Sequence, residues 1–334
     1  MTEQLELGRD LTDLARRRKL DPIVGRETEM EQLLAILCRR TKSNPLLVGE
    51  PGVGKTALVD GLALKIFHGD VPERFMRRRV LELPLGALLA GTQYRGDLEQ
   101  RVSQLLKQAQ SSGMIVFIDE IHLLAQAGRG SGLDVGNLLK PALARGDFCC
   151  IGATTPSEAE AFFAADPAFE RRFQSVIIDE PSPQALRAIV GSAAERLSAF
   201  HGLTISNDAI EAVLLASVDA QTPSGAGGRR NPDRALDLLE DACAQQHLRL
   251  SREIQFGSTL PPHVVALRQE LALAVGDLNV FRHIQVRDAY EAALASWRQA
   301  REAAPVGLRN LGRTEIERTV TARRLSSPLR PPVP

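Results

Sequence analysis

The stretch that decides the fold is Gly49-Glu50-Pro51-Gly52-Val53-Gly54-Lys55-Thr56, which follows the apolar run 45–48 and precedes an apolar segment that begins at Ala57. A strand, a glycine-rich loop and a helix in this order are typical of a phosphate-binding loop. The glycines at 49, 52 and 54 let the backbone curl, so that successive N–H groups point at nucleotide phosphates. The sequence therefore predicts a nucleotide site here.

The side chains of the loop indicate how it holds the nucleotide. Lys55 can reach the β- and γ-phosphates, and Thr56 offers a hydroxyl to Mg²⁺. The helix that begins there directs its positive N-terminal end at the same anion. The predicted nucleotide contacts in this stretch are Gly49, Pro51, Gly52, Val53, Gly54, Lys55, Thr56 and Ala57.

A second motif begins with the apolar run 115–118 and ends in Asp119-Glu120. A carboxylate at the end of a buried strand lies beside the phosphate loop, where it can hold Mg²⁺ directly or through water. Taken alone, this pair could be a solvated turn, but the loop upstream favours a catalytic role. We therefore expect Thr56 and Asp119 to hold Mg²⁺ and Glu120 to act as the base.

Composition bounds the remaining possibilities. The chain has 334 residues with 44% hydrophobic content, enough for a sizeable core and most simply for two domains. Lys and Arg total 41 and Asp and Glu total 41, so no global basic surplus points to nucleic acid or to an anionic membrane. The N-terminus is acidic, and no apolar run approaches the ~18 residues of a membrane span. The sequence predicts a cytoplasmic protein.

The cysteines and histidines give weaker signals. Cys38, Cys149, Cys150 and Cys243 form no CxxC pair, and we expect reduced core residues rather than metal ligands. His122 follows Asp119-Glu120 directly, and a supporting or packing role is favoured over a catalytic one.

Hydrophobic patterning predicts an α/β fold, a parallel sheet with helices on both faces, followed by a smaller helical domain. Strand-like runs alternate with helical patterns, and the strands cease after Pro181-Ser182-Pro183. Residues 262–303 predict a helical hairpin broken near Gly276, and the proline-rich tail is expected to be extended or disordered. The strand-like runs are 45–48, 79–83, 114–118, 148–153 and 175–178, and the helical ones 27–40, 55–68, 96–110, 134–145 and 183–200.

The predicted domain boundaries follow from these changes in pattern. Residues 1–180 form the large nucleotide-binding α/β subdomain, and residues 181–254 form a small helical subdomain. Residues 255–306 contain the helical hairpin, and residues 307–334 follow it and carry the tail.

The order of these motifs resembles the first ATPase module of the ClpA/ClpB/ClpC unfoldases of the AAA+ superfamily. The resemblance runs through almost the whole chain, in residues that have no generic explanation. The matching segments are 8–12, 20–26, 39–42, 49–56, 91–96, 117–122, 137–146, 151–155, 169–173 and 231–235.

The resemblance implies an AAA+ fold, ATP and Mg²⁺ as cofactors, and several site residues. Thr155 resembles the polar sensor that helps to position the attacking water. Arg172, with Arg171 beside it, matches the arginine finger that reaches into the neighbouring subunit's nucleotide site. Ile23 and Val24 would line the adenine end.

Two further positions are assigned by the resemblance alone. Arg234 occupies the second-sensor region, where related modules usually carry Lys. Tyr94, with Arg95 and Gly96, matches the pore loop that projects into the centre of a hexameric ring and grips a translocating polypeptide. The implied partners are a protein client and further copies of the chain.

Differences from the family also predict properties of this chain. The family's N-terminal domain and second ATPase module are expected to be absent, and with them the peptidase-docking loop. Residues 255–306 resemble a short middle-domain insertion, and the resemblance implies that residues 307–334 include the end of the small subdomain. The favoured function is a single-ring, ATP-dependent protein remodeller. The alternatives are an ATP-dependent regulatory or scaffold protein that switches assembly, possibly with a two-ring Clp relative, and a specialised secretion-sheath disassembly ATPase.

Overall fold

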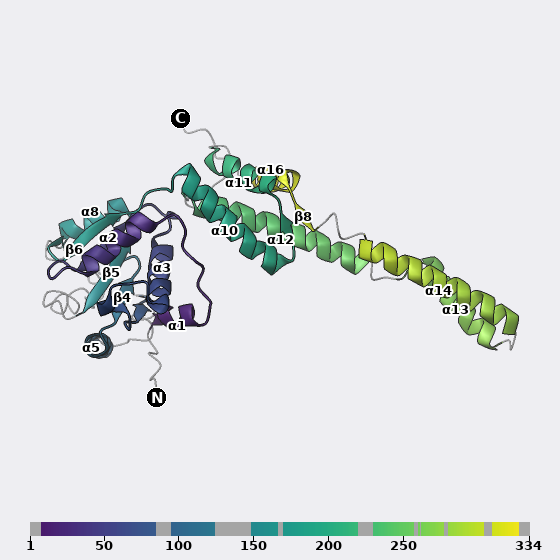
Figure 1. Ribbon diagram of the computed structural model, residues 1–334, viewed down its shortest axis with the longest axis horizontal. Helices are drawn as coiled ribbons and strands as arrows, with labels where there is room; N and C mark the ends of the chain where they lie inside the picture. The colour runs from purple at the N-terminus through teal and green to yellow at the C-terminus, as the bar shows by residue number, and fades with distance from the viewer. Residues whose placement is uncertain are drawn as a thin grey trace. The chain divides into compact units, whose positions relative to one another are not determined.

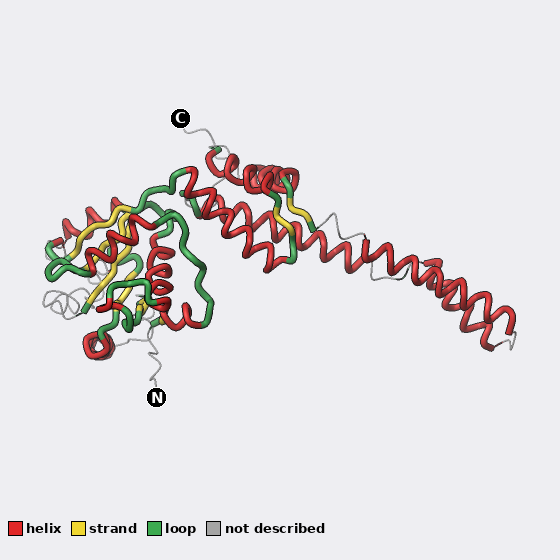
Figure 2. The backbone as a smooth tube through the Cα atoms, in the orientation of Figure 1, coloured by secondary structure: helices red, strands yellow, loops and turns green. Residues whose placement is uncertain are grey.

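The computed structural model describes residues 8–84, 95–123, 148–165, 170–219, 230–256, 260, 262–276, 280–303 and 309–326. The chain divides into two compact units. The first comprises Met1–Ile189 with Ser224–Arg234, and the second comprises Val190–Pro223 with Ala235–Pro334. The first unit carries the main sheet, and the second is largely helical (Figures 1 and 2).

The sheet of the first unit has six strands in the order β1-β3-β4-β5-β2-β6. The strands from β3 to β6 run parallel, as the sequence predicts, whereas β1 adds to the β3 edge in the antiparallel direction. The sequence did not indicate β1, because two residues are too few to show an alternating pattern. The strands are β1 (Arg9–Asp10), β2 (Asn44–Val48), β3 (Val80–Glu82), β4 (Ile115–Ile118), β5 (Cys149–Thr154) and β6 (Phe173–Ile177).

Helices cover both faces of this sheet, which confirms the predicted architecture. Alternate residues of each strand point to opposite faces, so Leu47 and Phe117 join one core while Leu46 and Ile118 join the other. The first face packs against α1 (Leu11–Arg16), α2 (Glu27–Leu37) and α3 (Lys55–His68). The second packs against α5 (Arg95–Ser112) and α8 (Pro156–Ala165).

In its described residues, the second unit is built from helices and one small sheet. In this sheet β7 (Thr204–Ile205) and β8 (Asn310–Leu311) pair in parallel, so the expectation that strands cease after residue 181 is wrong. Each strand has two residues, again too few for a visible pattern. The helices are α10 (Pro183–His201), α11 (Asn207–Val218), α12 (Asp233–Phe256), α13 (Pro262–Gly276), α14 (Val280–Ala303) and α16 (Arg313–Ser326); the first residues of α10 and α12 belong to the first unit.

Helices α13 and α14 lie side by side, as the periodicity of residues 262–303 predicts (Figure 1). The connection between them is only three residues long, which makes them antiparallel. Val264 and Ala274 of α13 are buried, and so is Val286 of α14, although each helix exposes most of its other residues. The hairpin therefore closes along one narrow apolar seam.

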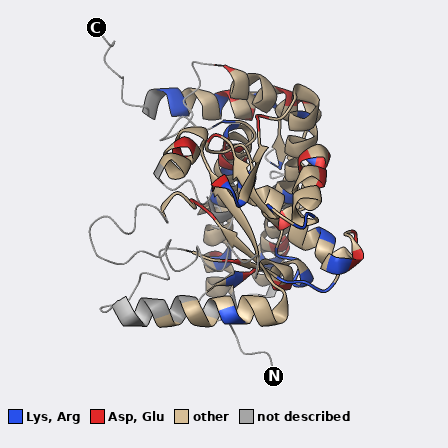
Figure 3. Ribbon diagram, turned by 90° about the vertical axis from the view of Figure 1, so that its left-hand side faces the viewer, with Lys and Arg blue, Asp and Glu red and all other residues tan. Residues whose placement is uncertain are grey.

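Several sequence predictions fall outside the described residues. These are the helix at 134–145 and most of the tail. Two of the four cysteines, Cys150 and Cys243, are buried, but Cys38 is exposed at the end of α2, so the expectation of four core cysteines is wrong. Basic and acidic residues are interspersed along the ribbon (Figure 3), in keeping with the balance of charge. Within the described residues, every helix is too short or too polar to cross a lipid bilayer.

Candidate nucleotide site

The glycine-rich loop connects the end of β2 to the start of α3, at the C-terminal edge of the sheet. The Gly49 N–H donates to the Thr154 carbonyl (3.2 Å), which ties the start of the loop to the neighbouring strand β5. Gly54 is the N-cap residue of α3, and it has no side chain that could accept a hydrogen bond from the first N–H groups of the helix. The first N–H groups of the helix are therefore left for an anion, and the helix dipole favours a phosphate there.

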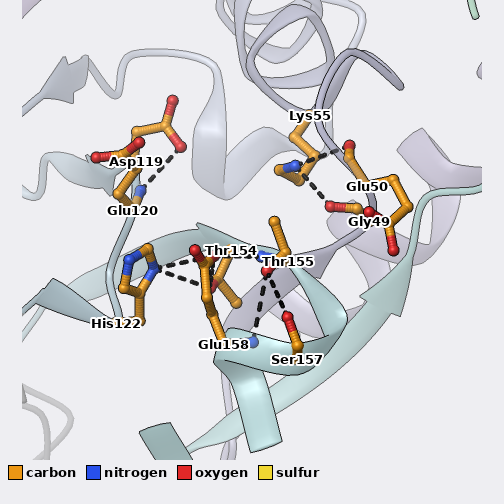
Figure 4. A network of polar contacts seen from close by, with 10 residues as sticks. All are labelled: Gly49, Glu50, Lys55, Asp119, Glu120, His122, Thr154, Thr155, Ser157 and Glu158. Carbon is orange, nitrogen blue, oxygen red and sulfur yellow. Dashed lines mark hydrogen bonds and ion pairs between the residues drawn. The ribbon is translucent and has the colours of Figure 1, made fainter. Parts of the chain in front are cut away.

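Lys55 points back over the loop. Its ammonium donates to the carbonyl oxygens of Gly49 (2.7 Å) and Glu50 (3.1 Å) (Figure 4). Burial lowers the pKa of Lys55, and the nearby carboxylates of Asp119, Glu158, Glu50 and Glu120 oppose that shift. A phosphate would add negative charge beside the ammonium and stabilise its charged form.

The structure brings the two predicted metal ligands together. The Thr56 hydroxyl donates to Oδ2 of Asp119 across 3.2 Å, although the residues are 63 positions apart in the chain. A hydroxyl and a carboxylate are the hard oxygen donors that Mg²⁺ prefers, and Mg²⁺ keeps waters at its remaining positions. These residues fit the ion that the family implies.

Glu120 follows Asp119 in an uncommon backbone conformation. Its φ is +49°, in the left-handed region that residues other than glycine seldom adopt. Its N–H donates to Oδ1 of Asp119 (2.9 Å), and its side chain is exposed at the sheet edge (Figure 4). The carboxylate therefore lies where solvent water can reach it.

Thr155 comes directly after β5 and caps the N-terminus of α8. The Thr155 N–H donates to Oε2 of Glu158 (3.1 Å), and the Glu158 N–H donates to the Thr155 hydroxyl (3.4 Å). This reciprocal pattern is a capping box, with Pro156 at the first helical position. Oε2 of Glu158 also accepts from the buried Thr154 hydroxyl (3.2 Å).

His122 joins the same network from the turn after β4. The residue is 9% exposed, and Nδ1 lies 3.1 Å from the Thr154 hydroxyl and 3.2 Å from Oε2 of Glu158 (Figure 4). The sequence favoured a supporting or packing role for His122, and the contacts that its ring nitrogen makes here are polar. Glu158 was missed altogether, although the spacing of Thr155 and Glu158 is the sequence signature of a capping box.

Arg26 is a second residue that sequence reasoning missed as part of the site. It is 6% exposed and donates to the carbonyl oxygens of Val53 (2.8 Å) and Asp179 (2.7 Å), while Glu29 balances its charge at 2.5 Å. A buried charge must be paired and hydrogen-bonded, and here it fixes the far side of the loop. The sequence placed Arg26 in the matching segment 20–26 but gave it no role, because the carbonyls that it reaches, at Val53 and Asp179, are distant in sequence.

The segment 230–234 lies against the loop. The Arg230 N–H donates to the Pro51 carbonyl (3.1 Å), and the Asp233 N–H donates to the Gly52 carbonyl (3.2 Å). Gly52 has a φ of +86°, and a Cβ there would lie 2.9 Å from that of Asp233, so only glycine permits this approach. The backbone of the predicted second-sensor segment, which continues into Arg234, is therefore held against the loop.

Ile23 packs against α3 near the loop. A Cβ on Gly61 of α3 would lie 2.5 Å from Cγ2 of Ile23, so the helix carries glycine where this side chain crosses it. Ile23 and the adjacent Val24 are both partly buried. Their assignment to the adenine end stays a prediction.

Arg171 and Arg172 are not brought to the loop of their own chain. They are exposed and directly precede β6, whose Phe173 pairs with Asn44 while its Ile177 pairs with Val48. The two arginines therefore lie at the N-terminal end of the sheet and the loop at the C-terminal end. The five residues of β2 separate these ends by roughly 16 Å.

The predicted pore-loop residues can be placed only in part. Tyr94 lies outside the described residues. Arg95 and Gly96 begin helix α5, of which only the backbone is described at these positions.

Comparisons with known proteins agree with this fold. The family of ATPases associated with various cellular activities (AAA) matches residues 45–180, and the AAA lid domain matches residues 182–277. The chain is 46% identical over 247 residues to the chloroplastic chaperone protein ClpB2 of Oryza sativa, covering 73% of this chain and 25% of that protein. It is 44% identical over 299 residues to heat shock protein hsp98 of Neurospora crassa, covering 88% of this chain and 30% of that protein.

Solved structures give the same result. The ADP complex of Hsp104 from S. cerevisiae superposes with a TM-score of 0.74 at 33% identity, covering 96% of this chain and 47% of that one. The extended Hsp104:casein complex superposes with a TM-score of 0.66 at 40% identity, covering 73% of this chain and 41% of that one.

The fold and the site define a P-loop AAA ATPase domain followed by an AAA lid. The chain belongs to the Clp unfoldase family of AAA+ ATPases, whose members include the ClpB and Hsp104 chaperones. It spans about a quarter to a third of the length of the curated relatives that it matches.

Proposed function

We propose that this chain is a Mg²⁺- and ATP-dependent protein remodeller that hydrolyses ATP at the boundaries between copies of itself. The observation that carries the proposal is the convergence of Lys55, Thr56 and Asp119 at one edge of the sheet, with Glu120 beside them. These are the groups that phosphoryl transfer to water requires, namely a cation for the phosphates, ligands for a metal ion and a base.

Each side chain has a distinct part in hydrolysis. Lys55 and the N-terminus of α3 bind the phosphates and offset their charge. Mg²⁺, held by Thr56 and Asp119, would supply further neutralisation of the β- and γ-phosphates. Glu120 orients the attacking water and accepts its proton, and the Thr155 hydroxyl helps to position that water.

The position of Arg172 supports action between copies. An arginine at the N-terminal end of the sheet is a sheet's length from its own loop, so it serves a nucleotide only on a neighbouring chain. A guanidinium that offsets charge on the γ-phosphate in this way makes hydrolysis depend on assembly. We expect a homohexameric ring, as in the family.

The relatives support a protein client. Several are chaperones, and one similar structure is a complex of Hsp104 with casein. We propose that Tyr94 contacts the client in the pore.

The test begins with ATP turnover by the full chain. We expect wild type to hydrolyse ATP when Mg²⁺ is present. Lys55→Ala should weaken nucleotide binding, because it removes the cation from the phosphates. Glu120→Gln should bind ATP normally but turn over about 100-fold more slowly. Absence of hydrolysis by wild type under every assembly condition would overturn the proposal.

A further arm separates a remodelling motor from a protein that uses ATP only to switch assembly. With ATP bound and hydrolysis blocked, Glu120→Gln should retain its protein client, which can then be purified with it and identified. Tyr94→Ala should leave ATP binding and assembly unchanged but abolish remodelling of that client. If Tyr94→Ala works as well as wild type in every assay that Glu120→Gln disrupts, the switch function replaces the motor.

A further inference from the structure

The turn that presents Glu120 is held in a conformation that it would not adopt alone. A non-glycine residue in this sparsely populated region is strained, and the conformation persists only where its surroundings impose it. Here the Ile121 N–H donates to the Ala153 carbonyl (3.0 Å), and the Leu123 N–H donates to the Glu120 carbonyl (2.9 Å). The backbone of the turn is thus tied to β5.

The only polar side chain of the turn after Glu120 is His122, and it also reaches β5. Its Nδ1 contacts the Thr154 hydroxyl and Oε2 of Glu158 at 3.1 and 3.2 Å. An ionised carboxylate only accepts hydrogen bonds, so Nδ1 carries the proton. The Thr154 hydroxyl in turn donates to Glu158 (3.2 Å) and keeps a lone pair for His122. Each polar atom in this network therefore has a role that agrees with its chemistry.

One carboxylate oxygen connects the two catalytic segments. Oε2 of Glu158 accepts from the Thr155 N–H and contacts His122, two residues past Glu120 (Figure 4). Burial raises the pKa of Glu158, but its contacts with the hydroxyl and N–H of Thr155, the charge of His122 and the Thr154 hydroxyl outweigh burial and lower it overall. The carboxylate is therefore ionised at neutral pH, as the network requires.

We infer that His122 and Glu158 are a positioning pair that fixes the Glu120 carboxylate and the Thr155 hydroxyl relative to each other. The inference rests on the proposed ATP hydrolysis, with Glu120 as base and Thr155 as sensor. A base and a sensor that address one water must keep a fixed separation, and a displacement of 1 Å can cost about 100-fold in rate. A cap of α8 alone would need Thr155 and Glu158 but not a buried histidine from another segment.

The experiment compares variants of the full chain at His122. His122→Phe keeps a buried ring but removes the donor, and the bond between Thr154 and Glu158 still satisfies those two groups. We expect kcat for ATP to fall about tenfold to a hundredfold while the KM and nucleotide affinity stay within about twofold. His122→Asn, whose amide N–H can take the place of Nδ1, should restore kcat to within about threefold of wild type.

Glu158 supplies a second, independent variant. Glu158→Gln keeps the capping box, because glutamine also serves at that position, but it removes the charge that faces His122. We expect a lower kcat at unchanged nucleotide affinity. Glu160→Gln is the matched control, since Glu160 is an exposed carboxylate on the same helix, and it should behave like wild type.

A double-mutant cycle tests whether the pair acts through Glu120. In the Glu120→Gln background, His122→Phe should have little further effect on the residual rate. Wild-type kcat in both His122→Phe and Glu158→Gln would overturn the inference. The inference would also be overturned if the fold-loss of kcat from His122→Phe were the same in the Glu120→Gln background as in wild type. A loss of kcat that parallels a loss of thermal stability and nucleotide affinity would overturn it as well. Failure of the proposed function is distinguishable, because wild type itself would then show no hydrolysis and Glu120→Gln no defect.

Discussion

Asp60 lies on α3 one turn past the phosphate loop, and Oδ1 of its carboxyl group is buried without a hydrogen-bond partner among the described residues. Burial raises the pKa of this carboxyl to about 6, Arg9 opposes the rise, and Glu82 and Asp21 add to it. An unfolded chain would release this proton near pH 4. The folded chain therefore holds a proton between about pH 4 and pH 6 that the unfolded chain has lost.

This difference makes Asp60 destabilising when it is ionised. The stability contributed by the group falls as the pH rises through that window and is lowest at neutral pH. A pKa raised from 3.8 to about 6 corresponds to at most about 3 kcal/mol, and partial exposure reduces this to about 1–2 kcal/mol. Asp60→Asn should therefore be more stable than wild type by that amount at pH 7.5, and equally stable near pH 4.

Denaturant unfolding of wild type and Asp60→Asn across this pH range measures the difference in their free energies of unfolding. The other titrating groups contribute equally to both proteins, so their effects cancel in this difference. Asp70→Asn is the control, because Asp70 is exposed, pairs with Lys65 and has a lowered pKa. It should give no gain at pH 7.5. A destabilised Asp60→Asn at pH 7.5 would show that the ionised carboxylate has a favourable partner.

At the scale of single elements, two helical glycines allow a matched comparison. A Cβ on Gly61 in α3 would lie 2.5 Å from Cγ2 of Ile23, whereas a Cβ on Gly191 in α10 would meet no atom of another described segment within 4 Å. Gly61→Ala should therefore destabilise by about 1–3 kcal/mol through overpacking. Gly191→Ala should stabilise by about 0.5–1 kcal/mol, because alanine loses less backbone entropy in a helix.

Both variants can be measured by chemical denaturation, with nucleotide titration as a second reading. Displacement of Ile23 by Gly61→Ala should also weaken ATP binding, if Ile23 lines the adenine end as the resemblance implies. Gly191→Ala should bind ATP as wild type does. Unchanged affinity in a destabilised Gly61→Ala protein would remove Ile23 from the nucleotide site.

At the scale of the whole molecule, the separation of Arg172 from its own loop predicts complementation between chains. Arg172→Ala and Lys55→Ala should each be nearly inactive alone, the first for lack of a cation in the neighbouring site and the second for lack of phosphate binding. Mixed, they should recover part of the ATPase activity, because some interfaces pair an intact loop with an intact arginine. Mass measurement with ATP should show an assembly in each case.

Two outcomes would contradict this assignment. Arg172→Ala with wild-type activity would show that the residue is not the finger. Inactive mixtures that nevertheless co-assemble would show that the two residues do not meet across a boundary. Glu160→Gln mixed with Lys55→Ala serves as the control for dilution, because the exposed Glu160 lies outside the site.

The sequence by itself determined the parts of this protein whose information lies in adjacent residues. The loop 49–56, the Asp119-Glu120 pair and the alternation of strands and helices could be predicted because each depends on local spacing and local chemistry. The family could also be predicted, because its motifs occur in a fixed order along the chain. Thr56 and Asp119 were placed together by a rule of the fold, since parallel strands end at one edge.

The tertiary structure alone decided which distant residues complete the site. Arg26 reaches the carbonyl oxygens of Val53 and Asp179, which follow the neighbouring strands β2 and β6. His122 follows β4 and contacts Glu158, which lies in the helix after β5, because β4 and β5 are neighbours in the sheet. The same order and register place Arg172 at the opposite end from its own loop. No local propensity encodes such contacts, because they depend on which strands pair and in which register, and that is settled only when the whole core packs.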